Sequence, residues 1–313
     1  MKRKMLFPGM MLILCVLIAA CSTSPGSGGG GGSSSSAPSA ATNYTSANIG
    51  TLIYVPAGAF QYDGTASDVC TISAAFHMSK YDITGTEFQN VTGITDPSSF
   101  SEANHPVETV SWYQALVYCN DLSIKEGLTP VYTISGSTSP SVWGAIPTSD
   151  NTTWDAVSAN WSASGYRLPT EMEYMWAAMG ATSGYGYTSG TYTTGYSKAF
   201  AGSTGANNIN NYAYTYSDTP TPASTEAIGL LLPNELGLYD MSGNVWQWCW
   251  DWYGSYPGGA LTDPTYNGAA SGAARVIRGG SWSDAASGAA VAYRNGSGPY
   301  FQYDLIGFRV VRP

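Results

Sequence analysis

The chain has 313 residues and a formal net charge of −9 at pH 7, and only 11% of its residues are charged. The acidic balance, and the lack of a Lys/Arg-rich segment after the first few residues, argue against nucleic acid as a partner. Tyr (23 residues) and Trp (10 residues) are abundant. Low charge with many amphipathic aromatic side chains is more typical of a binding protein at a cell surface than of a cytosolic enzyme.

The N-terminus has the pattern of a secretion signal. Three basic residues at positions 2–4 precede an apolar run over residues 10–20, which is shorter than the roughly 20 residues of a membrane span. Small residues lead to Cys21, and this pattern resembles a bacterial lipobox. The resemblance implies that residues 1–20 are removed, that Cys21 carries a lipid anchor in the membrane, and, because Ser22 follows, that the protein faces outward on the outer membrane. An ordinary signal peptide with an incidental cysteine is the alternative.

A polar tether is predicted over residues 21–45. From Ser22 to Thr42 the sequence consists only of Ser, Gly, Pro, Ala and Thr, which cannot bury a core. Random-coil scaling gives this tether a reach of roughly 25 Å. The remaining residues, 46–313, fit one large domain.

The domain contains three cysteines, Cys70, Cys119 and Cys249. Their odd number and the lack of a CxxC spacing give no disulfide framework, so we expect three buried thiols. One disulfide is the alternative in an oxidising compartment.

Few regular elements are predicted in the domain. Residues 54–60 have the pattern of a strand followed by a turn, and residues 76–83 alternate like a half-buried strand. Three segments begin with a capping box and end at a glycine, which predicts helices over residues 84–93, 111–127 and 170–180. Polar loops separate these elements, notably residues 184–216, which we expect to lie on the surface.

Four motifs resemble one known family. They are HPVETVSW (105–112), GYRLPTEMEY (165–174), NELGLYDMSGNVWQW (234–248), and RGGSW (278–282) closed by IGFRV (306–310). They are similar, in the same order, to motifs of formylglycine-generating-enzyme-like (sulfatase-modifying factor) domains. The resemblance implies an α+β, C-type-lectin-like fold with a small twisted antiparallel sheet, few helices and many ordered loops.

The oxidase chemistry of that family requires two copper-binding thiols after the RGGS motif. Aligned on this motif, the thiol positions fall at Asp284 and Ala289. Because Cu(I) requires soft thiolate ligands, we expect this activity to be absent. A related sulfoxide synthase needs an iron-binding histidine triad, and the chain has only His77 and His105. We expect neither histidine to serve in a zinc site or a catalytic triad.

Calcium is the one cofactor that the resemblance implies. The side chains of Asp240 and Gln247 and the backbones of Gly243 and Val245 would surround the ion. Gln247 stands where the family usually has Glu, and the loss of a charge weakens a site for a hard cation. A purely structural role for this corner of the chain is the alternative, so no cofactor is required.

The C-terminal segment, residues 278–309, combines two kinds of position. A framework (such as the RGGSW motif, Pro299 and residues 306–309) alternates with residues that resemble the variable positions of proteins diversified by retroelements, most closely the treponemal variable lipoproteins. The fifteen predicted variable positions are Ser283, Asp284, Ala285, Ser287, Gly288, Tyr293, Asn295, Gly296, Ser297, Gly298, Tyr300, Phe301, Tyr303, Asp304 and Leu305.

Two features of these positions suit a diversified binding patch. An AAY codon randomised at its adenines cannot encode Lys, Glu, Gln, Met or Trp, and none of the fifteen positions carries one of these residues. Their Tyr, Ser, Gly and Asn content is also that of antibody paratopes. The alternative is an ordinary Gly/Ser-rich surface loop, although four aromatic residues between positions 293 and 303 are many for such a loop.

The sequence therefore predicts a lipid-anchored, non-catalytic protein at the cell surface. Its variable patch would bind a protein or glycan on another cell or on a host. One alternative is an enzyme of the formylglycine-generating type, or its accessory protein, working without the copper thiols. Another is a structural or accessory lipoprotein of the same fold that has no variable site.

Overall fold

The computed structural model describes residues 42–181, 188–189, 192–193, 195–217, 223–264 and 271–313. They belong to one unit that spans Ala40–Pro313. The predicted signal peptide, Cys21 and most of the predicted tether lie outside the described residues. Within the described residues, no helix is both long and apolar enough to cross a membrane.

Four α-helices occur in the described part of the chain: α1 (Gly85–Thr92), α2 (Trp112–Lys125), α3 (Thr152–Asp155) and α4 (Glu171–Ala178). The three predicted helices are confirmed. In each, the Ser or Thr at the N-cap and the Glu or Gln three residues later exchange the two hydrogen bonds of a capping box. Glycines with positive φ follow all three helices, because an L-residue with a side chain is strained in that conformation.

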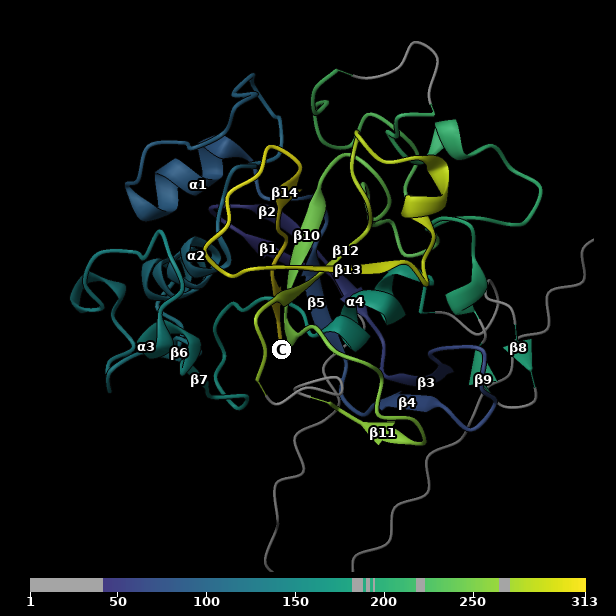
Figure 1. The fold of residues 1–313 in the computed structure, drawn as a ribbon, viewed down its shortest axis with the longest axis horizontal. Coiled ribbons are helices and arrows are strands. Elements are labelled where there is room, and N and C mark those ends of the chain that lie inside the picture. Colours follow the sequence, from purple (N-terminus) through teal and green to yellow (C-terminus); the bar gives the residue numbers. More distant parts are fainter. Residues whose placement is uncertain (1–41, 182–187, 190–191, 194, 218–222, 265–270) are drawn as a thin grey trace, which may run out of the picture. The chain divides into compact units, whose positions relative to one another are not determined.

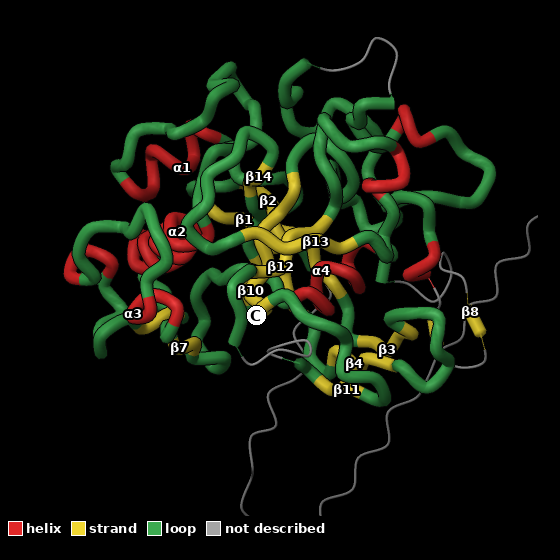
Figure 2. Tube along the Cα trace, viewed as in Figure 1, coloured by secondary structure: helices red, strands yellow, loops and turns green. Residues whose placement is uncertain are grey.

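The strands form short sheets surrounded by loops (Figures 1 and 2). The first sheet has the order β1-β2-β5-β15 (Tyr44–Ser46, Gly50–Val55, Phe76–Ser79, Val311–Arg312). The second has the order β13-β12-β10-β14 (Arg294–Ser297, Arg275–Arg278, Trp246–Trp252, Ile306–Gly307). The third has the order β11-β4-β3-β9-β8 (Leu261–Thr262, Val69–Ile72, Gly58–Gln61, Tyr192–Thr193, Thr188–Ser189), and β6 (Tyr132–Thr133) pairs with β7 (Ser158–Ala159).

Most of these strand pairs are antiparallel, and the parallel pairs (β10-β14, β11-β4 and β3-β9) are only one or two residues long. The predicted strand over residues 54–60 is split between β2 and β3 at Pro56, which lacks an N–H for pairing. The predicted strand over residues 76–83 ends earlier, at Ser79, whose hydroxyl donates to the Tyr81 carbonyl. Few helices and mostly antiparallel, curled sheets confirm the predicted α+β, C-type-lectin-like fold.

The second sheet separates two hydrophobic clusters. Trp248 of β10 and Ile277 of β12 belong to the cluster around α2. Their neighbours Cys249 and Val276 belong to the cluster around α4. Since successive side chains of a strand point to opposite faces, both faces of this sheet are covered. The second sheet is therefore a rigid base for the segments at its edges.

The loop over residues 184–216 differs from its prediction. Residues 195–216 of it alternate between exposed and buried positions, and Lys198, Phe200 and Thr215 are buried. The Lys198 ammonium donates to the Met179 carbonyl at 2.9 Å and to the Glu235 carboxylate at 2.5 Å. These partners offset the cost of burying the charge, so the expectation of a surface loop was wrong for this part. Residues 184–187, 190–191 and 194 lie outside the described residues.

Candidate ligand-binding face

The predicted variable region, residues 278–309, follows both edges of the second sheet. From the end of β12 it passes through the short helical turn η4 (Ala286–Ala289), forms the edge strand β13, and reaches the opposite edge strand β14. It is the yellow part of the chain in Figure 1. The rigid base of the domain thus carries the whole region.

The fifteen predicted variable positions divide by exposure. Seven are exposed: Ser283, Ala285, Ser287, Tyr293, Asn295, Phe301 and Tyr303. Five are half-buried: Asp284, Gly296, Tyr300, Asp304 and Leu305. Three are buried: Gly288, Ser297 and Gly298. Of the residues between them, Ala289, Val291 and Pro299 are buried, Ala286, Ala290 and Arg294 are half-buried, and Ala292 and Gln302 are exposed. The framework motifs that flank the region, residues 278–281 and 306–309, are buried.

Three of the four aromatic rings lie close together. The ring centroids of Tyr300 and Phe301 are 4.5 Å apart, and those of Phe301 and Tyr303 are 5.5 Å apart. Tyr293 instead packs against Trp246 of β10, at 5.9 Å. Tyr293, Phe301 and Tyr303 are 45%, 39% and 46% exposed. Rings this accessible contribute little to the core and can contact another molecule.

Backbone hydrogen bonds hold the loop that carries these rings. Its carbonyls accept from the backbone N–H groups of the surrounding framework, in the pairs Trp112–Pro299, Thr109–Tyr303 and Trp246–Leu305, at 2.7–3.0 Å. The Trp282 indole also donates to the Asp304 carbonyl at 3.2 Å. None of these bonds uses a side chain of the loop, although the Gln302 amide also donates to the Gln114 side chain at 2.7 Å, and Tyr300 and Leu305 pack against the core. The exposed Phe301 and Tyr303 side chains are not needed for the bonds that hold the loop.

Asp284 is held in the opposite way, through its side chain. One carboxylate oxygen accepts from the Trp246 indole at 2.8 Å, from the Ser281 backbone N–H at 3.0 Å and from the Ser281 hydroxyl at 2.5 Å. Its carbonyl accepts from the Tyr216 N–H at 2.8 Å. Asp284 thus orders the indole against which Tyr293 packs.

The glycines of the region are constrained by space. A Cβ at Gly296 would lie 2.7 Å from the Tyr253 ring, and one at Gly298 would lie 2.9 Å from the Phe301 ring. A Cβ at Gly288 would meet the Asp284 Cβ at 3.0 Å. Contacts this short force a neighbour to move, so a larger side chain here has a structural cost.

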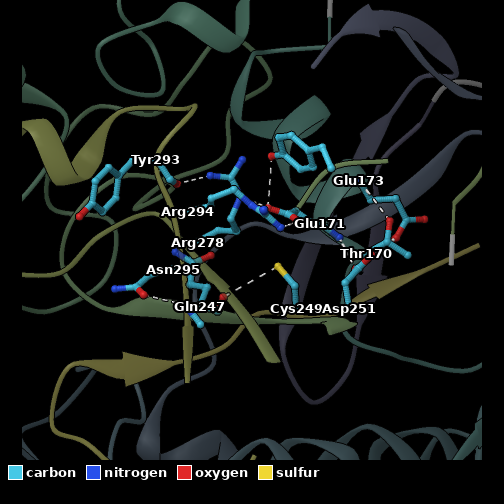
Figure 3. A network of polar contacts seen from close by, with 12 residues as sticks. Thr170, Glu171, Glu173, Gln247, Cys249, Asp251, Arg278, Tyr293, Arg294 and Asn295 are labelled. Atoms are coloured by element: carbon cyan, nitrogen blue, oxygen red, sulfur yellow. Dashed lines mark hydrogen bonds and ion pairs between the residues drawn. The ribbon is translucent and has the colours of Figure 1, made fainter. Parts of the chain in front are cut away.

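A buried ionic network links β13 and β12 to the start of α4 (Figure 3). Arg294 of β13 donates to both carboxylate oxygens of Glu171, at 2.7 and 2.6 Å, and Arg278, its partner in β12, lies 3.3 Å from the same carboxylate. Arg278 also donates to the Tyr293 carbonyl. Glu171 is fully buried at the start of α4. One carboxylate therefore offsets two neighbouring guanidinium charges and ties the edge strand to the helix.

Asp251 of β10 completes this network. Its carboxylate accepts from the Glu171 backbone N–H at 2.6 Å. Burial, reinforced by the neighbouring Glu171 charge, raises the pKa of Asp251 to about 8. Sequence reasoning missed the network, because Glu171 and Arg294 are 123 residues apart and no local pattern links them.

Comparison with known proteins identifies the family. The sulfatase-modifying factor enzyme 1-like domain matches residues 37–313. The chain belongs to this family. Among solved structures it resembles Treponema denticola variable protein 1, with 33% sequence identity and a TM-score of 0.72, over 87% of this chain and 99% of that one. The predicted resemblance to the treponemal type is thereby confirmed.

Two curated relatives show how far the similarity of this sulfatase-modifying factor domain extends. The chaperone protein LppX of Paenibacillus barcinonensis is 34% identical over 244 residues, which are 74% of this chain and 78% of LppX. The formylglycine-generating enzyme of Streptomyces coelicolor is 35% identical over 133 residues, which are 41% of this chain and 40% of the enzyme. Because the second match spans less than half of the enzyme, it does not by itself transfer the enzyme's activity.

The copper chemistry of the sulfatase-modifying factor family does not fit this site. The Asp284 carboxylate already accepts three hydrogen bonds, and Ala289 is a buried alanine. The three thiols of the domain lie elsewhere, buried and unpaired. Burial raises the pKa of Cys70 to about 12 and that of Cys249 well above its ordinary value. Burial thus keeps these thiols in their neutral form.

The predicted calcium ligands are engaged with other partners. The Gln247 amide oxygen accepts from the Arg309 guanidinium at 2.5 Å, and its NH₂ group donates to the Asp240 carbonyl at 2.8 Å. The Asp240 carboxylate accepts from the Gly229 N–H at 2.8 Å, while Gly243 and Val245 are buried in the same corner. A guanidinium so close to a ligand oxygen repels a divalent cation. The residues present therefore do not fit calcium, which stays an untested prediction.

The two histidines lie apart from the face. The His105 imidazole is 2.9 Å from the Thr225 hydroxyl, and His77 of β5 contacts the carbonyls of Thr42 and Pro313. Within the described residues, no group of three or more His, Cys, Asp or Glu side chains is arranged to hold a metal ion.

Proposed function

We propose that this protein binds other molecules through the exposed positions of residues 278–309, without catalysing a reaction. The observation that carries the proposal is the contrast in exposure within this segment. Tyr293, Phe301 and Tyr303 are at least 39% exposed, whereas the framework residues Arg278 and Arg309 are 1% and 0% exposed. A buried framework with exposed aromatic and small polar residues is the arrangement of a paratope.

Display on the cell surface is part of the same proposal. A lipid on Cys21 and the Gly/Ser-rich tether would hold the domain at the outer membrane with freedom to reorient. The binding partner would then be a protein or glycan on another cell or a host. The resemblance to Treponema denticola variable protein 1 supports diversification of the exposed positions.

The experiment compares two triple variants of the full chain after a wild-type target has been found by screening host and bacterial surface proteins and a glycan array. Y293S/F301S/Y303S removes the exposed rings of the face. The control, I124S/V142S/L230S, removes apolar side chains that are 47%, 66% and 62% exposed elsewhere. We expect the first variant to lose at least 100-fold in affinity, and the control to bind normally.

Both variants should melt within a few degrees of the wild type, because exposed substitutions rarely change stability by more than about 0.5 kcal/mol each. A large fall in Tm for the first variant would show that its rings belong to the core. Unchanged binding by that variant would contradict the proposed face. Oxygen-dependent conversion of a cysteine peptide by the purified protein would establish the enzymatic alternative instead.

A genomic observation tests diversification separately. We expect a near-copy of the codons for residues 278–309, differing at template adenines, beside a reverse-transcriptase gene. Absence of such a copy would favour an undiversified accessory lipoprotein.

The similarity to the chaperone LppX favours a second candidate function, assistance to the folding of another exported protein. An accessory protein of this kind would use a surface whose residues do not vary. Suppression of aggregation of co-exported proteins by both the wild type and Y293S/F301S/Y303S would support this candidate over the first.

A further inference from the structure

A hollow of about 490 Å³ lies beside the turn η4. One wall comes from the C-terminal segment, and the other from residues 199–209. The lining residues are Ala199, Phe200, Asn207, Asn208, Ile209, Ala286, Ser287 and Ala290. Of these, Ser287 alone is among the predicted variable positions, so a largely constant hollow adjoins the variable face.

Hydrogen bonds fix the two walls relative to each other. Val291 N–H donates to the Lys198 carbonyl at 3.1 Å, and Ala286 N–H donates to the Ser217 hydroxyl at 3.0 Å. The Ser242 hydroxyl bridges them again, since it accepts from Ala201 N–H at 3.0 Å and donates to the Ala289 carbonyl at 2.8 Å. The hollow is therefore preformed, which lowers the entropic cost of filling it.

The lining has no charged side chain. Phe200 and Ile209 supply apolar surface, and the Phe200 ring is fixed by packing against Tyr212 at 5.4 Å. The Asn207 amide oxygen accepts from Thr204 N–H, and its NH₂ group donates to the Gly202 carbonyl, both at 2.9 Å. Asn208 and Ser287 are the other polar side chains of the lining. With so few polar side chains, the hollow suits an apolar group better than a sugar, whose hydroxyl groups each need a partner when buried.

We propose that this hollow receives an aromatic or aliphatic side chain of a protein ligand, and that the residue at position 287 adjusts its mouth. The inference rests on the proposed function and deepens it, because it assigns the ligand to the protein class. Apolar anchors that enter preformed pockets are typical hot spots of protein interfaces. A ligand would thus use a constant anchor site together with the variable positions around it.

The experiment uses p-cresol, the side-chain analogue of tyrosine, and methyl β-galactoside as a sugar probe. The full chain is labelled at its alanine methyl groups, and both probes are titrated by NMR. We expect p-cresol to shift the methyl signals of Ala199, Ala286 and Ala290 with a roughly millimolar dissociation constant. Methyl β-galactoside should leave these signals unchanged.

Two variants fill the hollow from its opposite walls, S287W and A199W, at positions that are both exposed. Each should weaken p-cresol binding at least tenfold. The matched control is A292W, at an exposed residue of the same segment that does not line the hollow; it should bind p-cresol like the wild type. If S287W and A199W lose p-cresol affinity to a similar extent, misfolding of one variant cannot explain the loss. The Tm of each variant shows directly whether it is folded.

Absence of p-cresol shifts, equal binding by S287W, A199W and the wild type, or shifts of the same methyl signals by the galactoside would each overturn the proposal. The triple variant Y293S/F301S/Y303S distinguishes this failure from failure of the proposed function, because none of its residues lines the hollow. It should retain p-cresol binding. If p-cresol binds while that triple variant still binds its target, the inference about the hollow is supported and the proposed binding face is contradicted.

Discussion

Two parts of the C-terminal segment are held by different means. In the loop over residues 299–305, framework N–H groups and an indole donate to backbone carbonyls, and the Phe301 and Tyr303 rings extend into solvent. In the turn over residues 281–289, the Asp284 side chain itself accepts hydrogen bonds from Trp246 and Ser281. The loop is thus held mainly through its backbone, with one side-chain bond from Gln302 to Gln114, whereas the turn depends on the Asp284 side chain in addition to its backbone.

The difference bears on which positions can vary. A position anchored through its backbone tolerates many side chains, whereas one anchored through its side chain does not. By this criterion Tyr293, Phe301 and Tyr303 are free to change. Asp284 and the close-packed Gly298 carry a structural cost if they change. From composition alone, all fifteen positions were predicted to be variable.

The largest expected effect lies at the Glu171 carboxylate, which binds Arg294 of β13, between these two parts in sequence, and Arg278 of β12. Replacing it in E171A leaves the buried guanidinium groups of Arg278 and Arg294 without their carboxylate. Breaking a buried ion pair from one side typically costs about 3–5 kcal/mol. We expect a loss of this size in the free energy of unfolding, measured by urea denaturation.

The matched control is E102A, because the Glu102 side chain is 67% exposed. It should change stability by less than about 0.5 kcal/mol. Similar small losses in E171A and E102A would show that the network does not hold β13 to α4.

A smaller effect is expected at Asp284. D284A removes the acceptor of three hydrogen bonds and leaves the indole N–H of the buried Trp246 without a partner, which costs about 1–3 kcal/mol. The neighbouring S283A changes an exposed residue and should be nearly neutral. Equal stabilities of the two variants, measured by urea denaturation, would place Asp284 with the freely variable positions and remove the distinction between turn and loop.

Local sequence signals predicted the helices well. Each capping box involves residues only three apart, so Thr84, Ser111 and Thr170 mark helix starts with no knowledge of the rest of the chain. The sheets depend on distant pairings, such as that of Val311 in β15 with Met78 in β5. No local pattern encodes these pairings, so the order of the strands was not predicted, and the fold class was predicted only through resemblance to a family.

The candidate site was predicted in part for the same reason. An excess of tyrosine in a short polar segment indicated exposed rings, and the structure exposes Tyr293, Phe301 and Tyr303. The roles of Asp284 and Glu171 depend on Trp246 and Arg294, which are distant in sequence. The anchoring of the turn through the Asp284 side chain could therefore not be predicted from the sequence, whereas the exposure of the aromatic rings could be predicted from the composition of the segment.

The base of the face should respond to pH through Asp251. Its pKa is about 8 in the folded protein, against about 3.9 in an unfolded chain. Between these values the folded state holds a proton that the unfolded chain has released. Stability from this group is therefore fully present below about pH 4 and is lost as the pH rises through 8.

We expect the contribution of this group to the free energy of unfolding to fall between about pH 4 and 8, by at most about 1.4 kcal/mol per pH unit, and to level off above pH 8. Asp82, whose pKa burial also raises to about 8, contributes in the same window. The prediction therefore compares the wild type with D251N. The free energy of unfolding, measured by urea denaturation, should depend less steeply on pH in D251N. Parallel profiles would mean that Asp251 is already ionised at neutral pH.

The smallest expected effect is that of calcium. Arg309 bonds to the Gln247 amide oxygen and to the Asp82 carboxylate, and so supplies a cation in the corner where the family resemblance places the ion. We therefore expect less than a degree of change in Tm between 5 mM EDTA and 5 mM CaCl₂, concentrations at which a structural site would be emptied or filled.

R309M supplies the complementary measurement, since it removes the guanidinium but keeps a long side chain. It should destabilise the protein by several kcal/mol, and calcium should not restore the loss. A calcium-dependent Tm in the wild type would show that an ion, in addition to Arg309, holds the corner on which both the turn and the loop rest.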